Sequence, residues 1–154
     1  MLGKSIVLLA LVFSVACADK KYLESADGGG GGRNQKVTAR AQFANGYWVT
    51  YEWEERPTIK NGKKTFGSFI FKTFRPNLAD GSPVLIDLPG EHSVVLWMSS
   101  MNHGSSPVDV KQIDVGTYRA SKVFFTMDGE WDLRFLIKNG NVSDQAILTI
   151  IFKY

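Results

Sequence analysis

The sequence predicts an all-β fold: an immunoglobulin-like antiparallel β-sandwich of about seven to nine strands. Three observations lead to this prediction. Apolar and polar residues alternate along most of the chain after residue 36, and turn signals recur every eight to twelve residues. No segment there sustains the helical period of 3.6 residues. The chain has a single cysteine, Cys17, which excludes the disulfide that joins the two sheets in antibody domains.

The amino-terminal strands follow from alternation and aromatic content. Residues 36–43 put every second, apolar residue on one face, and residues 47–54 are rich in aromatic and β-branched side chains. Between them, Asn45-Gly46 is a turn signal. Residues 55–64 contain a proline and an Asn-Gly pair, so they predict a hairpin loop.

The later strands are separated by turns rich in proline, glycine and aspartate. They are expected at residues 65–74, 84–88, 92–98, 108–113, 117–127, 131–140 and 145–154.

The chain begins with a segment typical of a secretory signal peptide. Lys4 gives a basic start, and residues 5–15 are an apolar run too short to span a bilayer comfortably. The residues at the end of this run fit two processing routes. The run that ends in Cys17 resembles a bacterial lipobox, although Ser14 stands where leucine is usual, and in that route Cys17 is lipidated. Cleavage after Ala18 at an Ala-x-Ala site is the alternative, and it would remove Cys17.

We therefore divide the chain into a signal peptide at 1–17, a flexible tether at 18–35 and one β-sandwich domain at 36–154. The tether is polar, has no hydrophobic period and contains five consecutive glycines. A glycine-rich coil of this length reaches roughly 20–25 Å, which suits a link between a lipid anchor and a domain. We expect an exported, periplasmic protein anchored to the membrane as a lipoprotein.

Charge and motifs argue against several functions. The formal net charge is +3 with scattered basic residues, so we expect no nucleic-acid partner. No nucleophile elbow or phosphate-binding glycine loop follows a strand, and the domain has no cysteine nucleophile. The two histidines lack the spacing of a zinc site, and the Asp-Gly turns lack the carboxylates of a calcium loop. We do not expect an enzyme.

Residues 97–107, WMSSMNHGSSP, form a polar segment with an unusual set of metal donors. Met98, Met101 and His103 lie within six residues of one another. Met127 is expected at the end of a later strand, and a sandwich gathers its loops at two ends. Thioether sulfur favours Cu(I), and imidazole suits both oxidation states of copper. These four residues are therefore candidate copper ligands.

Core packing is the competing interpretation for two of these donors. Met98 and Met127 each follow an apolar strand, and methionine commonly fills gaps in cores. Met101 and His103 are harder to explain as packing, because their surroundings are polar. The other histidine, His92, follows a Pro-Gly turn and is expected at the surface.

These residues belong to a longer pattern. Its members are Met98, Met101, His103, Gly116, Tyr118, Phe125, Met127, Gly129 and Trp131. In this order and spacing, residues 97–137 resemble the central motif of the FixH/YtkA-like domains, which are small exported or membrane-anchored immunoglobulin-like modules of bacteria. Ser99 replaces the family's usual proline and Asn102 its usual glycine. Neither change removes a donor, but we expect both to affect the turn that brings Met101 and His103 together.

The resemblance implies an architecture similar to CopC-type copper-handling proteins and a link to copper supply for respiratory oxidases. We therefore expect a copper-binding envelope module, a chaperone or buffer that holds Cu(I). Its implied partners are the copper ion and an envelope protein or respiratory oxidase assembly factor. The alternative is a metal-free interaction or assembly lipoprotein, in which the aromatic strand at 47–54 pairs with a partner.

Overall fold

The computed structural model describes residues 39–154, which form strands and turns. The signal peptide at 1–17, Cys17 and the tether at 18–35 lie outside the described residues. No helix in the described part of the chain is long and apolar enough to cross a membrane. The all-β prediction is confirmed for residues 39–154.

Twelve strands lie within these residues, and seven of them have six residues or more. The longer strands are β2 (Trp48–Glu55), β5 (Gly67–Pro76), β7 (Glu91–Met98), β9 (Asp109–Asp114), β10 (Thr117–Val123), β11 (Gly129–Asn139) and β12 (Val142–Phe152). The shorter strands are β1 (Arg40–Gln42), β3 (Ile59–Lys60), β4 (Lys63–Lys64), β6 (Pro83–Leu85) and β8 (His103–Gly104).

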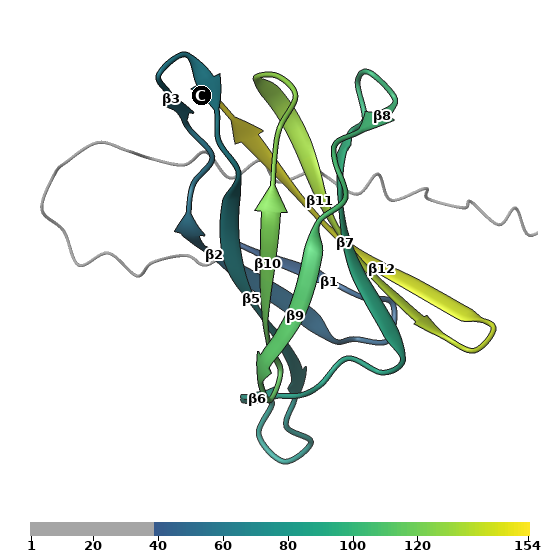
Figure 1. Ribbon diagram of the computed structural model, residues 1–154. Coiled ribbons are helices and arrows are strands. Elements are labelled where there is room, and N and C mark those ends of the chain that lie inside the picture. The colour runs from purple at the N-terminus through teal and green to yellow at the C-terminus, as the bar shows by residue number, and fades with distance from the viewer. Residues whose placement is uncertain (1–38) are drawn as a thin grey trace, which may run out of the picture.

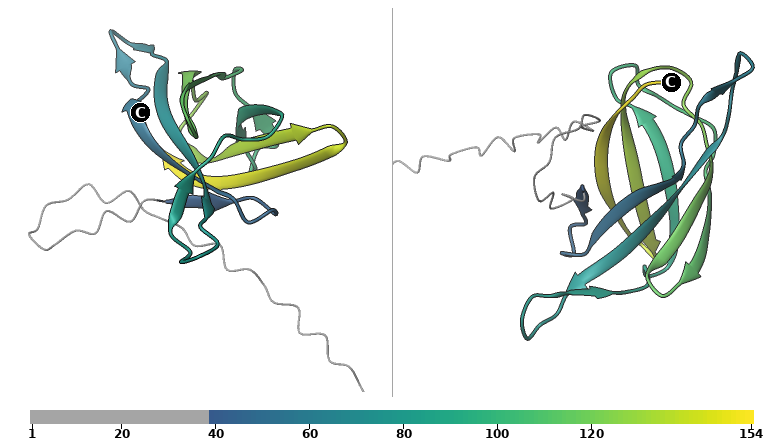
Figure 2. Two further views of the ribbon diagram at one scale, coloured as in Figure 1. Left: turned by 90° about the horizontal axis from the view of Figure 1, so that it is seen from below. Right: turned by 90° about the vertical axis from the view of Figure 1, so that its left-hand side faces the viewer.

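The strands form two antiparallel sheets that face each other, as a β-sandwich does (Figure 1). One sheet has the order β1-β2-β5-β10-β9, with β6 also paired to β5. The other has the order β12-β11-β7-β8. A small separate hairpin, β3–β4, projects beyond the sandwich (Figure 2).

The core lies between the two sheets and is rich in aromatic rings. Alternate residues of β11 are buried from Trp131 to Ile137, as the two-residue period of a strand requires. Phe135 of β11 meets Phe69 and Phe71 of β5 at ring distances of 6.3 and 5.2 Å, which joins the sheets. Burying each such ring stabilises the fold by about 1.5–3 kcal/mol.

Several strand bounds differ from the sequence-based expectation, among them those of two segments. The strand expected at 117–127 ends at Val123, because its register shifts after Ala120 and Lys122 has a φ of 58°. Met127 therefore lies in the loop before β11 and not at a strand end. The loop expected at 55–64 contains the β3–β4 hairpin, turned by an Asn-Gly pair whose φ angles are both positive.

Candidate functional site

The candidate ligands all come from one end of the sandwich, the upper end in Figure 1. Met98 ends β7, Met101 lies in the β7–β8 turn, and His103 begins β8. Met127 lies in the β10–β11 loop, whose tip is at the same end. We call this region the Met/His end.

Met98 and His103 are direct cross-strand partners in the β7–β8 pair. Paired residues project from the same face of a sheet. Met98 is only 3% exposed and belongs to the hydrophobic core. Its terminal methyl group lies beside Gly129, where a Cβ would come within 3.0 Å of it. The thioether is therefore packed between β7 and the start of β11.

The imidazole of His103 is half-buried and oriented by two contacts. Its ring stands edge-on to the buried indole of Trp131, 5.8 Å between centroids. Its Nδ1 lies 3.0 Å from the carbonyl oxygen of Gly104. A carbonyl only accepts, so this bond assigns the proton of neutral His103 to Nδ1. The lone pair then remains on Nε2, the usual arrangement of a ligating histidine.

Met101 is the exposed donor of the set, with 58% of its surface accessible. Its backbone N–H donates to the Met98 carbonyl at 3.2 Å and closes the turn. Asn102 follows with a φ of 53°, a left-handed conformation that asparagine tolerates better than most residues.

The loop that carries Met127 is fixed at every position from 124 to 128. The Ser105 hydroxyl donates to the Phe124 carbonyl, and the Tyr154 hydroxyl donates to the Phe125 carbonyl at 2.5 Å. The Lys64 ammonium donates to the Thr126 carbonyl at 2.5 Å, and the Trp131 indole N–H donates to the Met127 carbonyl at 3.1 Å. The Asp128 carboxylate accepts from the backbone N–H of Tyr154 at 3.1 Å. Each of these bonds contributes about 1 kcal/mol net. Met127, 39% exposed, therefore sits on an ordered loop.

A carboxylate that sequence analysis missed anchors the β7–β8 turn. Asp132 of β11 is 8% exposed and accepts hydrogen bonds from Ser99 at 2.6 Å, Thr149 at 2.8 Å and Arg134 at 3.2 Å. The guanidinium of Arg134 lies 5.1 Å above the Trp97 ring. Burial alone would raise the pKa of Asp132, but the three hydrogen bonds outweigh it and lower that pKa.

The sequence carried only a partial signal for this network. Asp132 and Arg134 are two residues apart on one strand and so share a face, which the alternating pattern predicts. Ser99 is 33 positions away in the chain, and no local pattern links it to Asp132. Ser99 therefore ties the candidate turn to the sheet.

The donors at the Met/His end are three thioethers and one imidazole. Within residues 39–154, no group of three or more His, Cys, Asp or Glu could hold a metal ion. Thioethers need no deprotonation and prefer Cu(I) to hard cations. The chemistry of the set therefore fits copper better than zinc or calcium.

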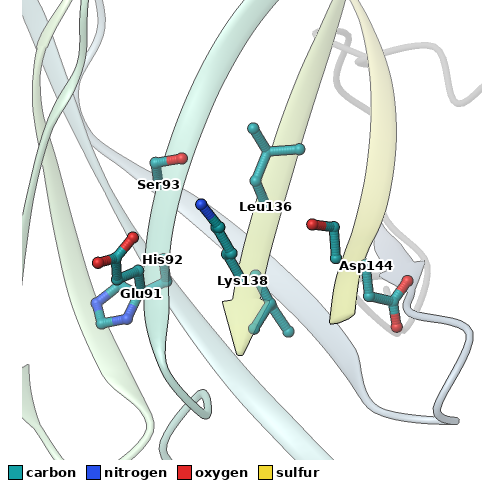
Figure 3. Close-up of a pocket in the computed structure, with 8 residues that line it drawn as sticks. Glu91, His92, Ser93, Leu136, Lys138 and Asp144 are labelled. Atoms are coloured by element: carbon teal, nitrogen blue, oxygen red, sulfur yellow. The ribbon is translucent and has the colours of Figure 1, made fainter. Parts of the chain in front are cut away.

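A hollow of about 380 Å³ lies at the opposite end of β7 (Figure 3). It is lined by Glu91, His92, Ser93, Leu136, Ile137, Lys138, Ser143 and Asp144. His92 is half-buried against Tyr118, with 4.7 Å between ring centroids, and its Nδ1 is buried without a partner among the described residues. The Asp144 carboxylate accepts from the backbone of Ala44. The two histidines therefore do not share a site, and this hollow contains no thioether.

Comparisons of the chain with protein-family models, curated proteins and solved structures find no match. The functional argument therefore depends on the residues of the chain itself.

Proposed function

We propose that the protein is a copper-handling module of the cell envelope that holds Cu(I) through Met98, Met101, His103 and Met127. It acts as a chaperone or buffer. It is exported to the periplasm and anchored through a lipid on Cys17. An envelope protein or respiratory oxidase assembly factor exchanges copper with it.

The observation that supports this most strongly is the order around the donors. Met98 and His103 are cross-strand partners, and Met127 lies on a loop hydrogen-bonded at five consecutive positions. Backbone order at Met98, His103 and Met127 reduces the entropy that these donors lose when they bind a metal. Met101, on the exposed turn, is the donor best placed to accept copper first.

The buried position of Met98 bears on how copper would bind. A thioether is neutral, so its burial carries no charge penalty and leaves it competent as a ligand. Its sulfur becomes available when Cu(I) enters beside His103. In this proposal Met98 packs in the core without copper and serves as a ligand with it.

We also propose that the sandwich has immunoglobulin-like topology. Four strands of the larger sheet have the order β2-β5-β10-β9, and the other sheet has β12-β11-β7-β8. In chain order these eight strands correspond to A, B, C, C′, D, E, F and G of an immunoglobulin domain, whose sheets are ABED and GFC with C′ at its edge. β1 adds one further edge strand beside β2.

Competition with a chromogenic chelator tests the copper proposal. Changing Met101→Ala and His103→Ala together removes an exposed thioether and the only imidazole of this end. We expect the affinity for Cu(I) to fall by more than about 100-fold, since loss of even an outer-shell partner costs about 10–100-fold. Affinity for Zn²⁺ should be weak before and after the change.

The matched control is His92→Gln, which changes the other histidine at the opposite end of β7. It should leave the Cu(I) affinity unchanged. Failure of the wild-type protein to compete for Cu(I), or equal loss in His92→Gln, would contradict the proposal.

A metal-free interaction module is the second candidate. β1 pairs with β2 only from Trp48 to Thr50, so a partner strand could extend β1 along the rest of that edge. The aromatic side chains of this strand favour the first proposal, because Tyr51 and Trp53 both stand edge-on to the buried Phe69. The core already explains why they are aromatic.

A further inference from the structure

The β3–β4 hairpin concentrates positive charge at the Met/His end. Between residues 56 and 66 four side chains are basic and none is acidic. Lys60 pairs with Lys63 across the hairpin, and Ile59 pairs with Lys64. The Lys64 ammonium donates to the Thr126 carbonyl and lies 4.4 Å from the centre of the Tyr154 ring. These two contacts hold the face of the hairpin that carries Ile59 and Lys64 against the domain. Lys60 and Lys63 occupy the other face.

Nearby acidic groups are already engaged. Glu54 pairs with Arg119 at 2.7 Å and accepts a hydrogen bond from Ser68. Glu55 lies 3.6 Å from Lys60, but both side chains are more than 60% exposed, so this pair contributes little. The hairpin therefore keeps a net positive charge.

The same hairpin exposes large apolar side chains. Ile59 is 54% exposed and Phe66 is 57% exposed. Phe66 is tilted against Phe124 of the β10–β11 loop, with 5.5 Å between ring centroids. The exposed Met101 lies at the same end. Basic and apolar side chains together at a projecting tip are typical of segments that bind the headgroup region of a membrane.

We propose that the β3–β4 hairpin docks the Met/His end of the domain on a lipid surface that carries negative charge. Lys60 and Lys63 meet the anionic headgroups from one face of the inserted hairpin, while the exposed Ile59 contacts lipid from the opposite face and Phe66 from the adjoining chain. The shape favours lipid over an acidic protein, because a specific protein interface needs about 20–30 residues on each side. A projecting two-stranded tip suits a penetrable surface instead. This proposal does not depend on copper.

Hydrogen exchange of residues 56–66 tests it directly. The exported protein is mixed with vesicles of phosphatidylcholine alone or with one third phosphatidylglycerol. We expect exchange in the hairpin to slow only with the anionic vesicles. Raising the salt concentration from about 0.1 to 0.5 M should weaken this protection, because it shortens the screening length. A lipid anchor would insert into both kinds of vesicle, whereas docking of the hairpin requires the anionic lipid. Comparison of the two vesicles therefore separates the two effects.

Variants separate the charged and apolar contributions. Lys60→Gln with Lys63→Gln should raise the vesicle concentration needed for half-maximal protection by about 25-fold, or about fivefold per charge. Phe66→Ser should raise it by about tenfold or more. Lys138→Gln, at the far end of β11, is the matched control and should change nothing. Because none of these variants touches a candidate copper ligand, their Cu(I) affinity should stay at the wild-type value.

Three outcomes would overturn the proposal. The first is no protection with anionic vesicles, and the second is equal protection with neutral ones. The third is protection by soluble polyglutamate without protection by vesicles, which would indicate an acidic protein partner.

Discussion

At the scale of single residues, Asp132 illustrates how a carboxylate is kept charged on a nearly covered surface. It lies beside Trp97 in the β7–β11 register and is 8% exposed. A buried carboxylate is costly unless hydrogen bonds satisfy its oxygens. Hydroxyl groups from Ser99 and Thr149 and the guanidinium of Arg134 satisfy them here. Asp132 thereby connects the candidate turn to both neighbours of β11.

Changing Asp132→Asn should destabilise the domain at neutral pH by about 1–3 kcal/mol, the cost of mismatched buried hydrogen bonds. The folded-state pKa of Asp132 lies below the unfolded value of about 3.9. Its stabilisation is therefore fully present above that pH and is lost as pH falls through the folded-state pKa. The stability difference between wild type and variant should shrink below about pH 4.

Urea unfolding of both proteins at about pH 7 and pH 3 measures this difference. The other carboxylates titrate in the same way in both proteins, so their contributions cancel in the stability difference. A difference that is the same at both pH values would show that the Asp132 charge does not stabilise the fold.

At the scale of elements, the β10–β11 loop depends on the end of the chain after β12. Tyr154 contributes two of the five bonds to the loop, from its hydroxyl and from its backbone N–H. Burial raises the pKa of Tyr154, so the hydroxyl remains a donor throughout the neutral range. The last residue of the sequence thus helps to position Met127, which precedes it by 27 positions.

Changing Tyr154→Phe removes one hydroxyl and leaves the Phe125 carbonyl without this donor. We expect a loss of stability of about 1–2 kcal/mol. Amide exchange should accelerate at residues 124–128 more than in the core strands, because the lost bond is local.

Tyr47→Phe is the control for this change. It removes a hydroxyl from a half-buried tyrosine directly before β2 and should lower the free energy of unfolding by less than about 0.5 kcal/mol. Uniform acceleration of exchange over the whole domain in Tyr154→Phe would contradict a local role for this bond.

At the scale of the whole molecule, the fold class follows from periodicity. Alternation places inward residues of a strand two apart, and the buried run from Trp131 to Ile137 obeys it. The strand expected at 92–98 is observed at Glu91–Met98, one residue longer than expected. The strand expected at 117–127 is shorter than expected, because the turn to positive φ at Lys122 carries no glycine or proline signal.

The details of the candidate site are less predictable. The sequence groups Met98, Met101 and His103 because they are close in the chain. It could not place Met98 in the core, since the same alternation fits a buried or a loop-facing methionine. Two of the bonds that order this end join residues 29 and 33 positions apart, beyond the reach of any local pattern.

The central claim is that four side chains at one end of the sandwich bind one copper ion. The most direct measurement is a titration of the purified protein with Cu(I), followed by NMR at the methionine methyl groups and the histidine rings. We predict that Met98, Met101, Met127 and His103 respond together and saturate at one equivalent, while His92 does not move. A response confined to Met101, or no response at any of the four, would contradict the claim.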